Sequence, residues 1–383
     1  MSSHTLSLRV VAVTRETRDA ITIHFEHPEG KRIASKPGQF LTLLVPLNGQ
    51  VERRSYSLCS APYEAPRLSV TVKRLPGGVV SNYLVDHCAV GMEMEVFEPM
   101  GTFQVVAEPA HARNMVLIGA GSGITPLMAM AKAVLHEEDK SRITLIYGNR
   151  NEDSIIFLDQ LNDLVAQYPG RLRVEHVLSQ PKTPPRKNGA LQAFSGLFFK
   201  KKPALEELAP LCRYAGRLNR KMLIDILRDL QLTDYLDTEF YLCGPEGLMD
   251  EAREALKLLK VGPERVHKES FVVVKQKAAE TTEISADSQD PAEGHVVTLI
   301  YEGTEYQVPV KKGQTILEAG LDQDIDLPYS CQAGLCTACR GKCLSGKVHL
   351  DEREGLSDAE MDEGYVLNCV GHPLTDDVVI EIG

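Results

Sequence analysis

The chain has 383 residues, of which 43% are hydrophobic and 25% are charged, and its formal net charge is −11. This length allows two or three domains with separate cores, and the composition is that of an ordinary soluble globular protein. The acidic balance argues against nucleic acid as a partner.

The cysteine count and the N-terminal sequence bear on the compartment. The nine cysteines are an odd number, and residues 1–5 show neither a basic segment nor an apolar stretch of signal-peptide length. The apolar run 115–135 contains three glycines, a proline and a lysine, which favours a strand, a turn and a helix over a membrane span. We therefore expect a cytoplasmic protein without disulfides and without membrane contact.

The first hundred residues alternate short apolar runs with turn residues. Such spacing predicts an antiparallel β-barrel. The expected strands are 6–13, 21–26, 40–45, 54–59, 68–73 and 94–97.

Two segments of this barrel suit a nucleotide with a planar ring. The period of a strand places Arg54, Tyr56 and Leu58 on one face, where a guanidinium can pair with phosphate and an aromatic ring can lie beside a flat ring system. Further on, the glycines 77 and 78 precede Ser81 and a helix-like stretch at 82–86, whose free amides suit a pyrophosphate. The alternative for this second segment is a tight turn in which Ser81 is the N-cap.

From residue 114 the pattern changes to strands that alternate with helices, which predicts a parallel sheet covered on both faces. The expected elements are 115–118, 126–136, 143–147, 155–168, 172–178, 221–230, 239–243 and 247–259.

Two turns in this region end strands and begin helices. The first runs from Gly119 to Pro126, where three glycines allow phosphates to approach the backbone and the proline lies at a helix start. It matches neither the G-x-G-x-x-G nor the G-x-S-x-G pattern, and any strand-to-helix turn can use glycines. The second follows the strand that ends at Cys243, which we expect beside the first turn because parallel strands end at one edge. Its alternative is a core cysteine before a Gly-Pro turn.

The last part of the chain carries most of the negative charge. Residues 273–294 are rich in Ala, Ser, Thr and acids and are interpreted as a linker. After it, 295–383 contain 6 Lys and Arg against 16 Asp and Glu, a net charge of −10, whereas the preceding 294 residues carry −1. The strands 296–301 and 305–310 and a helix at 315–321 are expected here. The acidic surface indicates a docking partner with a basic face, or serves only solubility.

Four cysteines in this part have the spacing of metal ligands. Cys331, Cys336 and Cys339 form C-x4-C-x2-C, and Cys369 follows after 29 intervening residues. This is the pattern of a plant-type 2Fe-2S cluster, and small residues between the cysteines leave room for it. A zinc site or a disulfide framework is the alternative, but zinc sites usually pair two C-x2-C units. Cys343 is close enough to compete as a ligand, although it is expected on a strand as a buried thiol.

Taken together, these motifs resemble the ferredoxin-NADP reductase superfamily fused to a plant-type ferredoxin. The domain order is similar to that of the reductase subunits of multicomponent oxygenases, in particular the phenylacetyl-CoA epoxidase reductases. The resemblance implies an antiparallel β-barrel for FAD at 1–110, an α/β parallel-sheet domain for NAD(P) at 111–272 with an insertion at 180–215, the linker, and a β-grasp ferredoxin domain at 295–383.

The resemblance also implies roles for individual residues. Ser57, Thr125, Cys243 and Glu269 would be catalytic, with Ser57 near the flavin N5 and with Thr125 and Cys243 framing the nicotinamide. Glu269 and Phe271 match a segment that closes over the flavin. Cofactor-binding residues would be Arg54, Tyr56, Ser57, Lys73, Gly78, Val80, Ser81, Gly119, Gly121, Ser122, Gly123, Thr125, Arg150, Ser179, Cys243, Gly244, Pro245 and Phe271, and the cluster ligands Cys331, Cys336, Cys339 and Cys369.

The chain departs from the family pattern near residue 180. Relatives commonly have Leu-Ser-Arg-Glu where this chain has Leu178-Ser-Gln-Pro, so a guanidinium for the 2′-phosphate of NADPH is missing there. Arg150, with Ser179, is the remaining candidate, which leaves NADPH or NADH as the donor. The basic insertion that follows is either a solvated loop or a docking surface.

The expected function is electron transfer from NAD(P)H through FAD and the 2Fe-2S cluster to an oxygenase component that docks near the acidic ferredoxin domain, with phenylacetyl-CoA epoxidase as the first candidate. A nicotinamide gives two electrons as hydride and a cluster accepts one, so a flavin between them is required chemically. Alternatives are another acceptor, such as a Rieske dioxygenase or a hybrid-cluster protein, an FMN-containing relative, and a non-enzymatic redox carrier or sensor.

Overall fold

A computed structural model describes residues 5–182, 212–230, 232, 237–270, 294–329, 332, 334, 336–353, 355–356 and 358–382. Within these residues no helix is both long and apolar enough to cross a membrane. The chain forms two compact units. One contains Met1–Val13, Ile23–Val106 and Lys268–Gly383, and the other contains Thr14–Thr22 and Ala107–His267.

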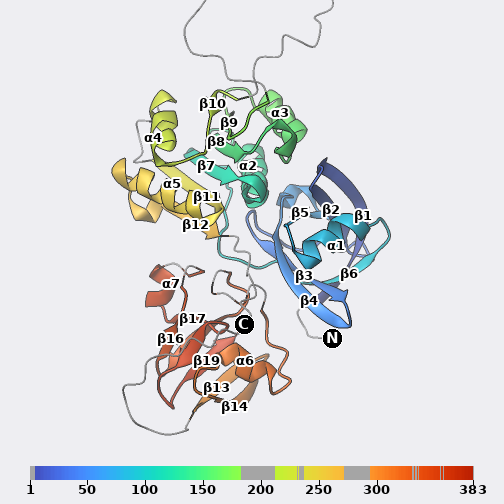
Figure 1. The fold of residues 1–383 in the computed structure, drawn as a ribbon, viewed down its shortest axis with the longest axis vertical. Coiled ribbons are helices and arrows are strands. Elements are labelled where there is room, and N and C mark those ends of the chain that lie inside the picture. The colour runs from blue at the N-terminus through green and yellow to red at the C-terminus, as the bar shows by residue number, and fades with distance from the viewer. Residues whose placement is uncertain are drawn as a thin grey trace, which may run out of the picture. The chain divides into compact units, whose positions relative to one another are not determined.

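The N-terminal region is a barrel of six strands in the order β4-β3-β6-β1-β2-β5 (Figure 1). Neighbouring strands are antiparallel in the pairs β3–β4, β3–β6 and β1–β6. A bridge between Leu58 and Val70 joins the end of β4 to β5 and so closes the sheet. The elements are β1 (Thr5–Thr17), β2 (Ala20–Glu26), β3 (Phe40–Leu47), β4 (Gln50–Ser57), η1 (Pro62–Glu64), β5 (Leu68–Lys73), α1 (Val79–His87) and β6 (Glu93–Phe97).

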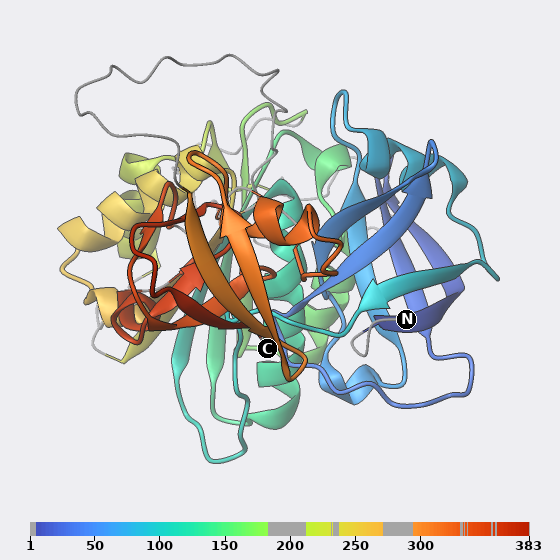
Figure 2. The ribbon, with the colours of Figure 1, turned by 90° about the horizontal axis from the view of Figure 1, so that it is seen from below.

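The second region is a six-stranded sheet in the order β10-β9-β8-β7-β11-β12, with parallel pairing from β10 to β11. Helices lie on both faces, with α4 and α5 on the opposite side from α2 and α3 (Figure 2). The elements are β7 (Asn114–Ala120), η2 (Gly121–Gly123), α2 (Ile124–Glu137), β8 (Arg142–Asn149), η3 (Glu152–Ser154), α3 (Leu158–Gln167), β9 (Leu172–Leu178), β10 (Tyr214–Ala215), α4 (Arg220–Asp229), β11 (Thr238–Gly244), α5 (Glu246–Leu258), η4 (Pro263–Arg265) and β12 (Val266–Ser270).

Burial explains the unbroken apolar runs of this sheet. One strand face, with Ile118, Ile146 and Phe240, packs against Leu223 of α4 and Ala252 of α5. A sheet covered on both faces has no solvent side, so its strands lack the alternation of the barrel strands.

A buried carboxylate, Glu138, holds the C-terminal end of α2 in place. Glu138 accepts hydrogen bonds from Arg113 Nη2 at 2.6 Å, from Arg113 Nε at 3.2 Å and from Ser141 Oγ at 2.6 Å, and His111 Nδ1 lies 3.2 Å away. Burial alone would raise the pKa of Glu138, but the bonds from Arg113 and Ser141 hold that pKa below its usual range. The ionised carboxylate therefore ties the segment that enters β7 to the helix end.

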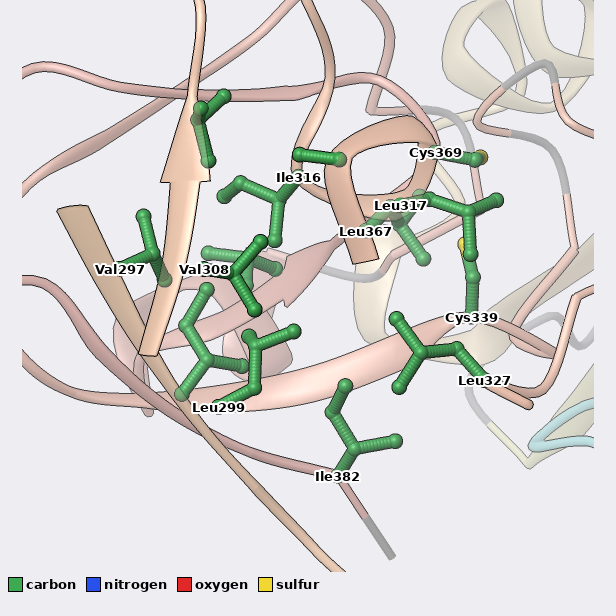
Figure 3. Close-up of a cluster of buried hydrophobic side chains, with 14 of the residues drawn as sticks. Val297, Leu299, Val308, Ile316, Leu317, Leu327, Cys339, Leu367, Cys369 and Ile382 are labelled. Atoms are coloured by element: carbon green, nitrogen blue, oxygen red, sulfur yellow. The ribbon is translucent and has the colours of Figure 1, made fainter. Parts of the chain in front are cut away.

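The C-terminal region is a five-stranded mixed sheet in the order β14-β13-β19-β15-β17, with the pair β16–β18 beside it. The last strand, β19, pairs in parallel with β13 and antiparallel with β15. Leu299, Ile316 and Leu327 lie in its core, with Cys339 and Cys369 at the edge (Figure 3). The elements are β13 (His295–Tyr301), β14 (Thr304–Val310), α6 (Ile316–Leu321), β15 (Arg340–Ser345), β16 (Val348–Leu350), α7 (Asp358–Asp362), β17 (Tyr365–Leu367), β18 (Gly371–Pro373) and β19 (Val379–Ile382).

This architecture confirms the expected fold class of barrel, parallel-sheet domain and β-grasp domain. Two local interpretations were wrong. Helix α1 begins at Val79 with Gly78 as its N-cap, so the alternative in which Ser81 is the N-cap does not hold. Helix α2 begins at Ile124, so Pro126 is its third residue, where an absent N–H still removes no intrahelical bond. Residues 273–293 of the linker, residues 183–211 of the insertion, Phe271 and Cys331 lie outside the described residues.

Candidate functional site

Strand β4 carries the residues expected to hold the flavin. The Arg54 side chain is 47% exposed and pairs with Glu52, whereas Tyr56 is half-buried and Ser57 is buried. Burial raises the pKa of Tyr56 well above its usual range, so its hydroxyl stays neutral. The strand therefore offers an accessible cation, an aromatic ring and a buried hydroxyl in succession, a set that fits a flavin nucleotide.

Two of the predicted catalytic residues meet although they are far apart in the sequence. Ser57 Oγ donates a hydrogen bond to Glu269 Oε2 at 3.3 Å, which joins β4 to β12 within one compact unit. Burial raises the pKa of Glu269 to about 8, and the bond from Ser57 partly opposes this shift. At neutral pH the Glu269 carboxyl is consequently protonated and available to exchange a proton.

The N-terminus of α1 is open to an anion. Its N-cap Gly78 makes no side-chain capping bond, so the first helical amides lack partners from the cap residue. A Cβ on Gly78 would lie 2.8 Å from Ser81 Oγ, which accepts a hydrogen bond from the Leu75 amide at 3.1 Å. Val80 is buried beneath this turn, and Lys73 precedes it at the end of β5. A side chain at position 78 would crowd Ser81, and the turn that glycine leaves free fits a phosphate group.

Arg74 was not singled out from the sequence, yet it holds this helix in place. Its guanidinium donates to both carboxylate oxygens of Asp86, at 2.8 and 2.6 Å, and to Asn82 Oδ1 at 3.0 Å. No local pattern signals this, because basic residues near turns are common.

The glycine turn after β7 meets the end of β11. Gly119 and Cys243 are paired across the parallel ladder. A Cβ on Gly123 would lie only 2.0 Å from the Cys243 carbonyl oxygen, so the two backbones touch where any side chain would stand between them. Cys243 is fully buried, and Gly244 and Pro245 lead directly into α5. Cys243 is thereby placed at the carboxyl edge of the sheet, where nucleotides bind in such folds.

Side chains around this turn keep it rigid. Thr125 is buried, and its hydroxyl donates to the Ser122 carbonyl at 2.9 Å. Tyr147, fully buried in β8, donates its hydroxyl to the Gly121 carbonyl at 2.9 Å. Tyr147 was not recognised from the sequence, where an aromatic residue in a buried strand predicts only core packing.

Two arginines lie at the same edge. Arg150 and Ser179 are exposed, and the chain segments that carry them run side by side, with the Gln180 amide donating to the Arg150 carbonyl at 2.7 Å. Arg217 is also exposed, and its Nη2 lies 3.7 Å from the point where a Cβ on Gly247 would stand. Arg217 was overlooked because it directly follows the insertion.

The cysteine motif is described in three of its four members. Cys336 is half-buried and Cys339 and Cys369 are buried, and none of them forms a disulfide. Among the described residues no three Cys, His, Asp or Glu side chains are grouped as a metal site, and Cys331 lies outside this part. The side-chain amide of Asn368, next to Cys369, donates a hydrogen bond to the Cys339 carbonyl at 3.0 Å and so connects the two cysteine segments. Thiols on two segments joined in this way are the donor set that a 2Fe-2S cluster requires.

Cys343 lies on β15, as expected, where it is paired with Ile380, but it is half-buried rather than buried. Its Sγ donates to the Ser345 carbonyl at 3.1 Å, and burial raises the pKa of the thiol. A thiol held protonated is a poor ligand, because metals bind the thiolate.

Three known families match successive parts of the chain. Residues 7–105 match the oxidoreductase FAD-binding domain, residues 117–193 the oxidoreductase NAD-binding domain, and residues 299–374 the 2Fe-2S iron-sulfur cluster binding domain. The chain therefore contains domains for FAD, for NAD and for a 2Fe-2S cluster.

Individual relatives match over their whole length. The chain is 34% identical to a subunit of the 1,2-phenylacetyl-CoA epoxidase of Escherichia coli K12, over 98% of this chain and 97% of that protein. It is 36% identical to the ferredoxin reductase component of 3-ketosteroid-9-alpha-monooxygenase of Mycolicibacterium smegmatis, over 99% and 98%. The crystal structure of phthalate dioxygenase reductase has the same fold, with a TM-score of 0.57 at 22% identity over 99% and 98% of the two chains.

Proposed function

Since this chain belongs to the ferredoxin-NADP reductase superfamily, among the NAD(P)H oxidoreductases that are reductase components of multicomponent oxygenases, we propose that it passes electrons to an oxygenase component by way of FAD and the 2Fe-2S cluster. Phenylacetyl-CoA epoxidase is the first candidate acceptor, because one polypeptide of that enzyme matches the chain from end to end. We propose that residues 1–110 form the FAD-binding domain, residues 111–272 the NAD(P)-binding domain and residues 295–383 the ferredoxin domain.

Bound FAD supplies a group that accepts hydride and releases electrons singly. The protein contributes alignment and exclusion of water. We propose that Cys243 and Thr125 position the nicotinamide and that Ser57 and Glu269 hold the proton that accompanies hydride transfer. The observation that carries this assignment is the hydrogen bond from Ser57 to a carboxyl whose pKa is about 8, because such a carboxyl can gain or lose a proton near neutral pH.

A second candidate acceptor follows from another relative. The ferredoxin reductase component of 3-ketosteroid-9-alpha-monooxygenase of Mycolicibacterium smegmatis is 36% identical over 99% of this chain, so a monooxygenase of that kind is a candidate after the epoxidase. Reconstitution with purified oxygenase components of each kind decides between them: substrate-dependent NAD(P)H oxidation with one component and not the other identifies the acceptor. Arg150 and Arg217 are exposed at the sheet edge, where their guanidinium groups could bind the 2′-phosphate of NADPH, so we propose NADPH as the donor.

The electron path is tested with two cysteine variants of the purified protein. Cys369→Ser removes a proposed ligand, and we expect it to lose the cluster absorption and cytochrome c reduction while ferricyanide reduction by NAD(P)H continues through the flavin. Cys343→Ser is the matched control and should keep all three properties. If the wild-type protein, loaded with flavin and iron, oxidises neither NADPH nor NADH with either acceptor, the redox carrier or sensor is the better interpretation.

A further inference from the structure

Arg53 lies in β4, next to the proposed flavin residue Arg54, but its side chain is directed elsewhere. The side chain is only 13% exposed. Its Nη2 donates to Asp326 Oδ1 at 2.7 Å, and its Nη1 donates to the Leu327 carbonyl at 3.1 Å. The guanidinium therefore binds a side chain and a backbone carbonyl that are more than 270 residues away along the chain.

Two aromatic rings complete the surroundings of this guanidinium. The Arg53 Cζ lies 4.4 Å from the ring centroid of Tyr329 and 5.2 Å from that of Phe97. Phe97 ends β6 of the barrel, and Tyr329 belongs to the ferredoxin domain. Arginine suits this place better than lysine, because a planar guanidinium can donate two hydrogen bonds at its edge while its face contacts an aromatic ring.

The contact joins the two parts of the chain that hold the flavin and the cluster in the proposed electron path. On the barrel side, Ser57 follows Arg53 by four residues of the same strand, which is roughly 13 Å. On the ferredoxin side, Tyr329 precedes the proposed ligand Cys331 by two residues, which span at most about 7 Å. Leu327 is fully buried in the ferredoxin core, so its carbonyl is a fixed acceptor. Both partners lie in the same compact unit of the chain.

We propose that Arg53 is the docking residue that holds the ferredoxin domain on the FAD-binding barrel and so sets the rate at which electrons pass from flavin to cluster. The effect of Arg53 on the electron-transfer rate rests on the proposed function, whereas the docking of the ferredoxin domain does not depend on it. The charge distribution agrees, because a ferredoxin domain with a net charge of −10 meets a basic residue of the barrel. Asp326 keeps 57% of its side-chain surface exposed, so the contact can open without burying an unpaired charge.

The test compares Arg53→Gln and Asp326→Asn with wild type in anaerobic stopped-flow experiments with NAD(P)H. We expect unchanged flavin reduction and a cluster reduction phase that is about tenfold slower in both variants. The double variant should be no slower than the single ones, because both substitutions remove the same contact. Arg9→Gln, which breaks the exposed barrel pair Arg9–Glu93, is the matched control and should behave as wild type.

A second measurement needs no electron transfer. Hydrogen exchange of residues 325–329 in the oxidised protein should be about tenfold faster in Arg53→Gln and unchanged in Arg9→Gln. Wild-type rates of both exchange and cluster reduction in Arg53→Gln and Asp326→Asn would overturn the proposal. Faster exchange in a protein whose cluster is never reduced by NAD(P)H would instead contradict the proposed function and leave the docking role standing.

Discussion

Replacing Gly123 by alanine should open the nucleotide edge of the sheet. An alanine Cβ would lie 2.0 Å from the Cys243 carbonyl oxygen, 2.5 Å from its carbonyl carbon and 2.8 Å from the Gly244 nitrogen. Ordinary contacts begin at 3.4 Å, so the two backbones must separate by 1.4 Å. Because both obstacles are backbone atoms, no side-chain rotation relieves the clash. We expect a cost of about 3 kcal/mol, at the upper end for overpacked sites.

The cost is measured locally, since a multidomain chain does not unfold in one step. Hydrogen exchange of β7 and β11 should accelerate about 150-fold, because each 1.4 kcal/mol corresponds to a factor of ten. The dissociation constant of NADP⁺ should rise more than tenfold. Gly247→Ala is the matched control. Its Cβ would meet only Arg217 Nη2, at 3.7 Å, in the first turn of α5, so it should leave exchange unchanged or slow it slightly.

The reasoning fails if Gly123→Ala exchanges its β7 and β11 amides at the wild-type rate. That result would mean that the approach of the glycine turn to β11 is loose in solution. A large acceleration in both Gly123→Ala and Gly247→Ala would point to general sensitivity of the domain rather than to the Cys243 contact.

Three further substitutions test other contacts. Tyr147→Phe removes the hydrogen bond to the glycine turn, worth about 1 kcal/mol, so the KM for NAD(P)H should rise roughly fivefold with little change in kcat; an equal fall in kcat would contradict a positioning role. Glu138→Gln should lower the free energy of local opening of β7, measured by hydrogen exchange, by about 2 kcal/mol at pH 7. The lowered pKa of Glu138 contributes stability above the unfolded-state pKa, and this stability is lost as pH falls through the pKa of the folded protein. The variant should therefore lose less stability in acid than wild type does. Glu269 has the opposite sign, because a pKa of about 8 in the folded protein lowers stability as pH rises above the unfolded-state pKa. The urea concentration at which half of the flavin is released should therefore fall between pH 5 and pH 9 in wild type, and fall less in Glu269→Gln. An equal fall in both proteins would refute the buried, neutral carboxyl.

Much of the nucleotide edge could be predicted from the sequence, for a geometric reason. Each motif ends a strand, and parallel strands end at one edge, so Gly119 and Cys243 had to be neighbours once the sheet was expected. The first residues of α1 and α2 were harder to predict, because their N-cap residues, Gly78 and Gly123, have no side chain that could mark the start of a helix. The family resemblance supplied Glu269, which no spacing rule connects with Ser57.

Contacts between distant segments could not be predicted in this way. Arg53 and Asp326 are separated by 273 positions, and Arg53 has the same local sequence environment as the neighbouring Arg54. The two arginines differ only in the face of β4 from which they project and in what lies opposite. Tyr147 is a similar case, since a buried tyrosine in a strand does not show from the sequence which carbonyl its hydroxyl reaches.

The position of β19 has a consequence for how the protein is made. Strand β19 lies between β13 and β15, so the ferredoxin sheet has no complete centre until residues 379–382 have been synthesised. The barrel and the parallel sheet precede it and can fold while translation continues. We therefore expect the ferredoxin sheet to be completed only after the barrel and the parallel sheet have folded.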